Sequence, residues 1–433
     1  MSNKIALGVY GLLAVNTLFA LEPLSLSTAY DLALKNEPRL KSVSFKTQAN
    51  AEAIEQVRAR LYPQLQGTAS WGRYEYEAQY LNNKAVKENY TDYTISAAQA
   101  IYHPEYWRGI DQAKMKQSAT EYQYKAQAQQ LGLDLCKSYF TVLKDNKNVD
   151  LALSQKNYYE QKYKQLEEML KFGLTNRIDL LETKIQRDKA TSQWLTEQKR
   201  TQIAKLRLEH LIGDKIDQLK SFDFEQINPE KLVLQRSDWE SKISQNPSLK
   251  ASESSVNAAY DEIAIRNYEH YPKVDININR KQTESSDPYT HSYDNQAILR
   301  MSIPLYQGGY TQSRVREGLL LLNSAKKEQE YYRQESKSRF EEAWEERQFT
   351  MDNFNNLKES QRSSELYLQS IEKAHEAGLK SLVDVLEAKA KVYEIKRDLI
   401  DAGYELINNH LTLLDVTGEL NVENILGYEK SLN

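Results

Sequence analysis

The sequence predicts a mainly α-helical protein with a small β part, built from two copies of one unit. Two observations predict the helices. There are nine prolines among 433 residues, and residues 105–228 and 305–433 contain none of them. Because proline breaks a helix interior at a cost of about 3 kcal/mol, each tract can form very long helices. A third observation, a repeated set of landmarks, predicts the duplication.

The landmarks occur twice, in the same order along the chain. Matching residues are 209 positions apart early in each copy and 205 apart later. The matched sets are Asn36-Glu37-Pro38 with Asn246-Pro247, Tyr62-Pro63 with Tyr271-Pro272, Gly173-Leu174 with Gly378-Leu379, and Leu211-Ile212-Gly213 with Val416-Thr417-Gly418. Four sets in register indicate an internal repeat rather than chance similarity.

Each copy is expected to begin with a short helix and two strands. The helices span roughly 38–61 and 247–270, and a Tyr-Pro pair ends each one. In the second copy, apolar and polar residues alternate from Val274 to Asn279 and from Ala297 to Leu305, which predicts strands with one apolar face. In the first copy, residues 93–101 alternate clearly and residues 65–76 less so. Polar loops are expected at 79–90 and 282–292.

A long helical hairpin is expected to follow in each copy. The first helices run from about 107 to 171 and from about 310 to 377, or about 100 Å each. Gly173 and Gly378 end them, and return helices end at Gly213 and Gly418. The second return helix has an apolar residue at every seventh position, which is typical of a coiled coil: Leu379, Leu386, Tyr393, Ile400, Ile407 and Leu414.

The N-terminus predicts export. Lys4 precedes an apolar run from Ile5 to Leu21 with the small residue Ala20 near its end, as in a cleaved signal peptide. No later apolar run approaches the roughly 20 residues of a membrane-spanning helix. The expected division is a signal peptide at 1–20, a first repeat at 21–213, a linker at 214–236, a second repeat at 237–418 and a tail at 419–433.

Composition excludes several functions. A net charge of -4 argues against nucleic acid as a partner, and a single cysteine, Cys136, excludes a disulfide framework or a cysteine-based zinc site. The six histidines form no His-Glu-x-x-His motif, and there is no P-loop or dinucleotide-binding glycine pattern. We therefore expect no catalytic, cofactor-binding or metal site.

Four strands per chain cannot close a membrane barrel, since the smallest closed barrels have eight and open strand edges are not tolerated in lipid. If the strands lie in the outer membrane, several chains must share one barrel, and helices of about 100 Å must project from it. The sequence thus predicts an oligomeric tube. The alternative is a periplasmic or secreted coiled-coil scaffold or adhesin without a pore, for which two alternating strand pairs would have no use.

In all these features the chain resembles the TolC-like family of outer-membrane efflux channels. The resemblance spans about residues 24–418 and includes the repeated landmarks and the junction Pro304-Leu305-Tyr306-Gln307-Gly308-Gly309. The first copy departs from it, because Ile101-Tyr102-His103-Pro104 lacks the Gly-Gly pair. The resemblance implies a homotrimer with a shared twelve-stranded barrel in the lipid of a Gram-negative outer membrane and a helical barrel in the periplasm. It also implies a passive exit duct that works with a periplasmic adaptor protein and an inner-membrane transporter.

The resemblance also implies roles for residues at the hairpin tips. Gly173, Leu174, Gly378 and Leu379 would contact the adaptor. Asp384 and Glu387 lie three residues apart on one helix face, which by itself is typical of a solvated surface. In the family, acidic residues at these positions form a ring at the closed end of the tunnel, with Glu387 standing where a second Asp is usual.

Three further residues match positions that hold the family's gate closed. Lys380 stands where the family has an arginine, and Asp179 matches that arginine's acidic partner. His375 stands where the family often has a tyrosine. If His375 paired with Asp179, closure could depend on pH, because histidine titrates near neutrality.

Overall fold

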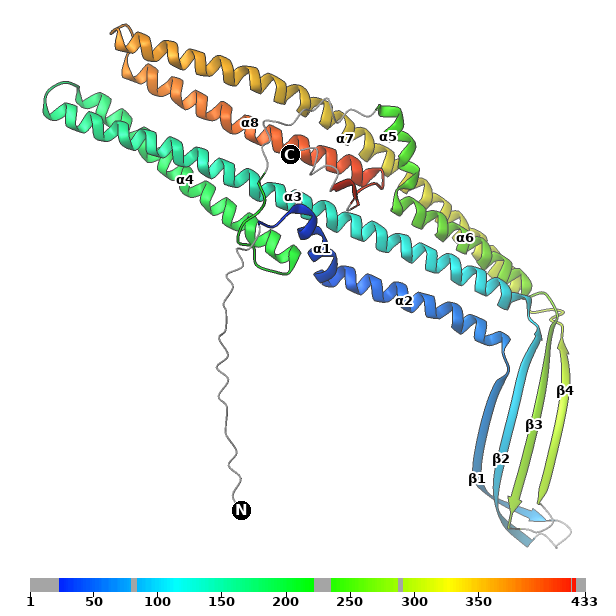
Figure 1. Cartoon of the computed structure of the whole chain (residues 1–433). Helices are drawn as coiled ribbons and strands as arrows, with labels where there is room; N and C mark the ends of the chain where they lie inside the picture. Colours follow the sequence, from blue (N-terminus) through cyan, green and yellow to red (C-terminus); the bar gives the residue numbers. More distant parts are fainter. Residues whose placement is uncertain (1–22, 79–83, 222–234, 287–290, 422, 426–433) are drawn as a thin grey trace, which may run out of the picture.

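The computed structural model describes residues 23–78, 84–221, 235–286, 291–421 and 423–425. The expected signal peptide lies outside these residues. Long helices run side by side along most of the molecule, and a single four-stranded sheet extends from one end of them (Figure 1). Within the described residues, no helix is both long and apolar enough to cross a membrane.

The described part of the first half contains four main helices and two strands. They are α1 (Leu26–Asn36), α2 (Pro38–Arg58), β1 (Gln64–Ala78), β2 (Lys84–Tyr102), α3 (Pro104–Lys171) and α4 (Arg177–Ile212), with one short 3-10 turn at Ala59–Leu61. The 68 residues of α3 form one continuous helix. The expected order of short helix, strand pair and long hairpin is present.

The second half repeats this order. It consists of α5 (Arg236–Lys242), a 3-10 turn at Ile243–Gln245, α6 (Pro247–Tyr268), β3 (Lys273–Ser285), β4 (Ser292–Ser302), α7 (Tyr310–Glu376) and α8 (Leu382–Val416). The sequence analysis missed α1 and α5, which are short helices that precede the landmark prolines Pro38 and Pro247. All four strands are antiparallel neighbours in the order β1-β2-β3-β4.

The strands are longer than the sequence analysis expected. Residues 84–90, assigned to a polar loop, belong to β2, and residues 282–285 belong to β3. These ends of the strands carry polar residues on both faces, so they lack the apolar alternation from which strands were recognised. The loops at 79–90 and 282–292 were therefore predicted too long.

The long helices pack in a fixed order. α3 lies between α4 and α8, and α8 lies between α3 and α7. Nearer the sheet, α2 packs on α3, while α6 packs on both α3 and α7. The result is a layer of helices in which α2 and α4 form one edge and α7 forms the other.

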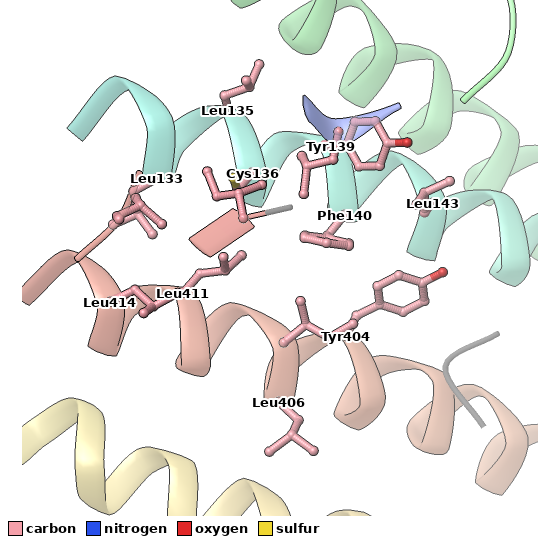
Figure 2. Close-up of a cluster of buried hydrophobic side chains, with 14 of the residues drawn as sticks. Leu133, Leu135, Cys136, Tyr139, Phe140, Leu143, Tyr404, Leu406, Leu411 and Leu414 are labelled. Atoms are coloured by element: carbon pink, nitrogen blue, oxygen red, sulfur yellow. The ribbon is translucent and has the colours of Figure 1, made fainter. Parts of the chain in front are cut away.

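The main apolar core lies where α3 and α8 cross the middle of the molecule. Figure 2 shows Leu133 and Phe140 of α3 facing Tyr404 and Leu411 of α8. Cys136 is fully buried there, and burial raises the pKa of its thiol to about 12. The seven-residue row predicted for α8 is buried at Leu386, Ile400, Ile407 and Leu414.

A further buried row on α8, which faces α7, was not predicted. Val385, Ala388 and Val392 pack against Leu368 and Ile371 of α7. Because α8 is covered by α3 on one side and α7 on the other, it needs two apolar seams rather than one.

The repeated asparagines join the beginning of each short helix to the end of the return helix of the same copy. Asn36 donates a hydrogen bond to the carbonyl of Ile212 (2.9 Å), and Asn246 donates to the carbonyl of Val416 (3.0 Å). Asn246 also accepts from the backbone N–H groups of Ser248 (2.9 Å) and Leu249, so it caps α6 as well. In each copy, the asparagine landmark and the landmark at the end of the return helix are therefore in direct contact, although they are distant in the sequence.

We expect Asn246→Ala to lower the free energy of unfolding by about 1–3 kcal/mol, because a buried helix cap and a carbonyl partner are lost together. Asn246→Ser keeps a capping oxygen and should fall between the wild type and the alanine variant. Thermal unfolding followed by circular dichroism measures both. The exposed Asn257→Ala is the matched control, and an equal loss in that variant would contradict the prediction.

Candidate functional site

One face of the four-stranded sheet is apolar. Paired residues of neighbouring strands share a face, so the registers divide the side chains into two sets. Several members of the apolar set are more than half exposed, such as Trp71 (73 %) and Leu299 (69 %). The apolar members of this face are Leu65, Gly67, Ala69, Trp71, Tyr93, Ile95, Ala97, Tyr102, Val274, Ile276, Ile278, Ala297, Leu299 and Met301, and polar residues that share the face include Thr91, Gln99, Arg280, Gln282 and Asn295.

The opposite face is polar. It carries Gln64, Gln66, Thr68, Ser70, Asp92, Thr94, Ser96, Asp275, Asn277, Asn279, Lys281, Asp294, Gln296 and Arg300, with Ala98, Ala100 and Ile298 as apolar exceptions. On this face Asp92 pairs with Lys281 (3.1 Å) and accepts from Thr283 (2.6 Å). A sheet with one apolar and one polar, charge-bearing face is suited to separating lipid from water.

Aromatic residues lie on both faces. Trp71, Tyr93 and Tyr293 are on the apolar face, where an interfacial girdle is expected. Tyr74 and Tyr90 are on the polar face instead, and their rings stack with centroids 4.5 Å apart. The aromatic residues near the first strand pair therefore do not all lie on one face of the sheet.

A buried polar cluster joins the sheet to the helices. His103, which precedes α3, places Nδ1 3.1 Å from Glu105 and Nε2 2.9 Å from Asp275 of β3. Lys273 pairs with the same Glu105 oxygen at 2.9 Å. Burial alone would raise the pKa of Glu105, but the hydrogen bonds and charge of its partners, Lys273 first, outweigh burial and lower it.

The hairpin tips have the same local structure. Gly173 (φ 70°) and Gly378 (φ 72°) adopt the left-handed conformation that glycine favours. The amides of the leucines that follow, Leu174 and Leu379, bond to carbonyls five residues earlier (2.9 and 2.8 Å), which closes a Schellman cap. Yet Leu174 is 69 % exposed and Leu379 79 %. The caps fix the backbone and leave both leucines without local packing.

Two of the predicted gate residues cap helices in this chain. Asp384 forms a capping box with Ser381: its carboxylate accepts from the Ser381 amide (2.9 Å), and its own amide donates to Ser381 Oγ (3.2 Å). Asp179 has the same position in α4, with Asn176 as its partner. Hydrogen bonds from Ser381 lower the pKa of Asp384, so its carboxylate is charged at neutral pH.

The remaining predicted gate residues do not contact Asp179 in this chain, and the polar contacts of Lys380 and His375 join residues of their own tip. Lys380 pairs with Asp384 at 3.4 Å, and His375 Nδ1 donates to the Lys380 carbonyl at 2.9 Å. Glu387 is exposed on α8. The two tips lie apart within one chain (Figure 1), so a contact of Lys380 or His375 with Asp179 would have to involve another copy.

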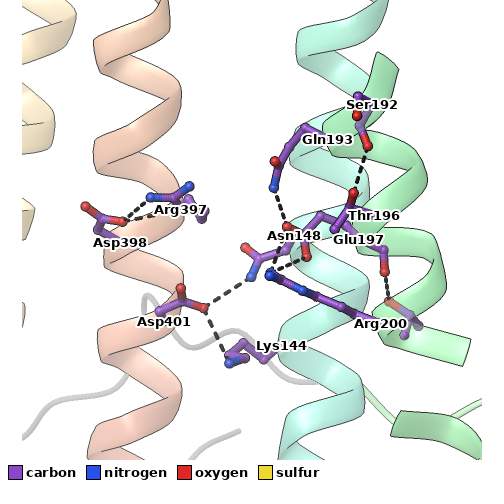
Figure 3. A network of polar contacts seen from close by, with 11 residues as sticks. Lys144, Asn148, Ser192, Gln193, Thr196, Glu197, Arg200, Arg397, Asp398 and Asp401 are labelled. Carbon is purple, nitrogen blue, oxygen red and sulfur yellow. Dashed lines mark hydrogen bonds and ion pairs between the residues drawn. The ribbon is translucent and has the colours of Figure 1, made fainter. Parts of the chain in front are cut away.

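A polar layer that the sequence analysis missed crosses α4, α3 and α8. Figure 3 shows Asp401 of α8 bonded to Asn148 (3.1 Å) and Lys144 (3.6 Å) of α3, while Glu197 of α4 accepts from Arg200 (3.2 Å). Burial raises the pKa of the nearby Asp145, and the negative charges of Glu197 and Asp401 add to the shift. The sequence signal for this layer is Arg397, which pairs with Asp398 and interrupts a second seven-spaced row on α8 that is otherwise apolar: Val383, Ala390, Tyr404 and Leu411.

Comparison with known proteins identifies the family. The model of the outer membrane efflux protein family matches residues 29–214 and 240–419. The chain belongs to the outer membrane efflux protein family. It is 23 % identical to outer membrane protein TolC of Salmonella enteritidis, over 94 % of this chain and 84 % of the relative. It is also 23 % identical to the proteases secretion protein PrtF of Dickeya chrysanthemi, over 94 % and 90 %.

Solved channels share the fold. The structure matches CusC with a TM-score of 0.82 at 19 % identity, covering 90 % of this chain and 91 % of CusC. It matches the outer membrane channel CmeC of Campylobacter jejuni with a TM-score of 0.80 at 16 % identity, covering 94 % and 90 %. The protein is thus an outer-membrane channel of the kind used in efflux or type I secretion by Gram-negative bacteria. The family consists of transport channels, not enzymes.

We expect His103→Phe to destabilise the protein by about 1–3 kcal/mol near neutral pH, because the largely buried Glu105 and the half-exposed Asp275 each lose a hydrogen-bond donor. The ring stack on Tyr106 can survive this substitution. A carboxyl with a lowered pKa stabilises the fold at neutral pH and stops doing so as pH falls through that pKa. The deficit should therefore shrink as Glu105 is protonated.

Thermal unfolding followed from pH 7.5 down to about pH 2.5 measures this effect, because the pKa of Glu105 lies below its usual value of 4.5. His270→Phe, at an exposed position after α6, is the matched control. A deficit that stays constant across this pH range would show that the Glu105 contact contributes nothing.

Proposed function

We propose that three copies of this chain close a single pore, which serves as a passive exit duct through the outer membrane and the periplasm. The observation that carries the proposal is the sheet. It has one apolar face, one polar face and unpaired edges on β1 and β4. Lipid does not tolerate unpaired backbone groups, and four strands are too few to close on themselves. A twelve-stranded barrel shared by three chains satisfies both constraints.

The edges of the helical layer support the same assembly. α4 carries an exposed apolar row that includes Ile178 (74 %), Leu181 and Leu206, and α7 exposes Leu320 (70 %) and Phe349 (67 %). Exposed apolar surface of this extent is typical of an interface. If α7 of one copy packs against α2 and α4 of the next, the helices close into a tube below the barrel.

We propose that the hairpin tips dock a periplasmic adaptor protein, which connects the channel to an inner-membrane transporter. Support comes from Leu174 and Leu379, which remain exposed although the backbone around them is fixed by caps. Rigid, exposed apolar side chains are suited to binding, because little conformational entropy is lost on contact.

The gate of the proposed duct is a ring of Asp384 and Glu387 at the tips. In a trimer, Lys380, Asp179 and His375 would hold the tips together by contacts between copies. The lowered pKa of Asp384 keeps its carboxylate charged at neutral pH, which suits a ring that attracts cations.

The proposed division of the chain follows the asparagine contacts. We propose a first repeat at 21–213, which contains the contact of Asn36 with Ile212. The second repeat, at 237–418, contains the contact of Asn246 with Val416. A signal peptide at 1–20, a linker at 214–236 and a tail at 419–433 complete the proposal.

We expect Leu174→Ser and Leu379→Ser together to abolish export while leaving the fold intact, because both side chains are exposed and neither glycine cap is altered. Export of a fluorescent dye by cells that depend on this channel measures the effect. Glu168→Ser, exposed near the end of α3, is the control and should export normally. Normal export by the leucine variant would contradict the docking proposal.

Planar-bilayer recordings test the pore and its gate. We expect the wild-type protein to form cation-selective channels, and Glu387→Gln to shift the reversal potential in a salt gradient toward zero, because one ring of charge is lost. Glu387 has no capping role, so this variant keeps the tip intact. Glu359→Gln, exposed on α7, should retain the wild-type selectivity.

Absence of any conductance from the wild type would overturn the proposed duct. If Glu387→Gln conducted with unchanged selectivity, only the proposed ring of acidic residues would be contradicted, and the proposed duct would stand.

A further inference from the structure

The unpaired edges of the sheet carry information about how the copies join. β1 and β4 each have one strand neighbour within the chain and one free edge. In the proposed shared barrel, on which this inference rests, β4 of one copy must pair with β1 of the next. The remaining question is the register of that pairing, which decides which residues face each other across every subunit boundary.

The two faces of the sheet restrict the register. The apolar residues of β1 and β4 are odd-numbered, so an antiparallel pairing keeps them on one face only when odd positions face odd positions. Allowed registers therefore differ by steps of two residues. Three of them bring the apolar parts of both strands together, and they place Gly67 opposite Leu299, Met301 or Ile303.

Closure of the barrel restricts it further. Following the hydrogen-bonded pairs across one sheet leads from Thr68 to Thr94, then to Lys281 and Asp294. If Gly67 faces Met301, Asp294 faces Tyr74 of the next copy, and the path has advanced six residues on β1. Over three copies the path advances about 18 residues along the strands while it crosses twelve strands. With about 3.3 Å per residue and about 4.8 Å between strands, the strands then tilt by about 46° from the barrel axis.

The neighbouring registers give other tilts. With Gly67 opposite Ile303 the advance is eight residues and the tilt about 54°, well beyond the 35–45° of membrane barrels. With Gly67 opposite Leu299 the advance is four residues and the tilt about 35°. Closure alone thus excludes the Ile303 register and leaves the other two.

The position of the apolar band decides between these two. The band is the stretch of each strand that carries the apolar residues, and it shifts along the strands from β1 to β4. For example, following the paired residues across the sheet leads from the apolar Trp71 to the polar Glu284, and from the apolar Ile95 to the polar Arg280. With Gly67 opposite Met301, the band on β1 of the next copy spans the same level as the band on β4. Opposite Leu299, by contrast, Trp71 would face the polar Asn295.

Side-chain size favours the same register. The facing apolar pairs become Gly67 with Met301, Ala69 with Leu299, and Trp71 with Ala297, so a small residue meets a large one each time. Met301 is 60 % exposed and Leu299 69 %, and nothing in the chain lies within 4 Å of a Cβ placed on Gly67. We propose that β4 pairs with β1 of the neighbouring copy in the register that sets Met301 opposite Gly67.

Cysteine cross-linking of the full-length protein in membranes tests the register. Facing residues of antiparallel strands have Cα atoms about 5 Å apart, within disulfide range, whereas a shift of two residues adds about 7 Å along the strand and exceeds it. In a Cys136→Ser background, we expect Gly67→Cys with Met301→Cys to form covalent oligomers on oxidation. Ala69→Cys with Leu299→Cys should do the same at a second level.

Gly67→Cys combined with Leu299→Cys or with Ile303→Cys are the shifted controls, and they should cross-link on the order of tenfold less. Stronger cross-linking in either control would overturn the register while leaving the shared barrel standing. Failure of all four pairs to cross-link would overturn the pairing of β4 with β1, and with it the proposed trimeric barrel.

Discussion

The structure depends on one constraint: a four-stranded sheet with an apolar face has two edges that cannot remain open in lipid. Each unpaired N–H or C=O in hydrocarbon costs several kcal/mol, which is comparable to the whole stability of many domains. The sheet is therefore incomplete in a single chain. The same incompleteness continues into the helical layer, where α4 and α7 expose apolar side chains at the two lateral edges. Strands and helices thus require the same neighbour, and the continuous helices α3 and α7 transmit that geometry from the membrane toward the tips (Figure 1).

The asparagine contacts explain how so elongated a chain keeps its shape. A helix of 68 residues has no preferred position along its partner unless something fixes its axial register. Asn36 and Asn246 provide that fixed point, because each ties the start of a short helix to the last carbonyls of a return helix at the level of the main core. Gly418 completes the second contact: a Cβ at this position would lie 2.9 Å from the Gln245 carbonyl oxygen. From there the hairpins extend to tips whose backbone is set by local caps alone.

Much of this was accessible from the sequence, because it depends on local or periodic signals. Proline placement predicted the long helices, the repeated landmarks predicted the duplication, and alternation located the apolar parts of the strands. The missing parts depend on contacts between distant segments. The α8 row of Val385, Ala388 and Val392 is buried only because α7 packs against it, and the layer of Asn148, Glu197 and Asp401 requires three helices to meet (Figure 3). At the tips, sequence resemblance singled out Asp384 and Asp179, but it could not reveal that both are bound to their own helix caps.

The two strand-to-helix junctions differ, and the sheet explains why. β2 lies inside the sheet, with β3 of the same chain beside it, so a buried clamp can be built within one protomer: His103 and Glu105 meet Asp275 and Lys273. β4 is an edge strand, and in the proposed assembly its second neighbour belongs to another chain. Among the described residues its junction has no comparable clamp, and Leu305 remains 92 % exposed while Gly308 and Gly309 turn the chain with positive φ. The absence of the Gly-Gly pair from the first copy is thus no irregularity of the duplication. It follows from the position of each strand, since only the interior junction can be completed before the copies assemble.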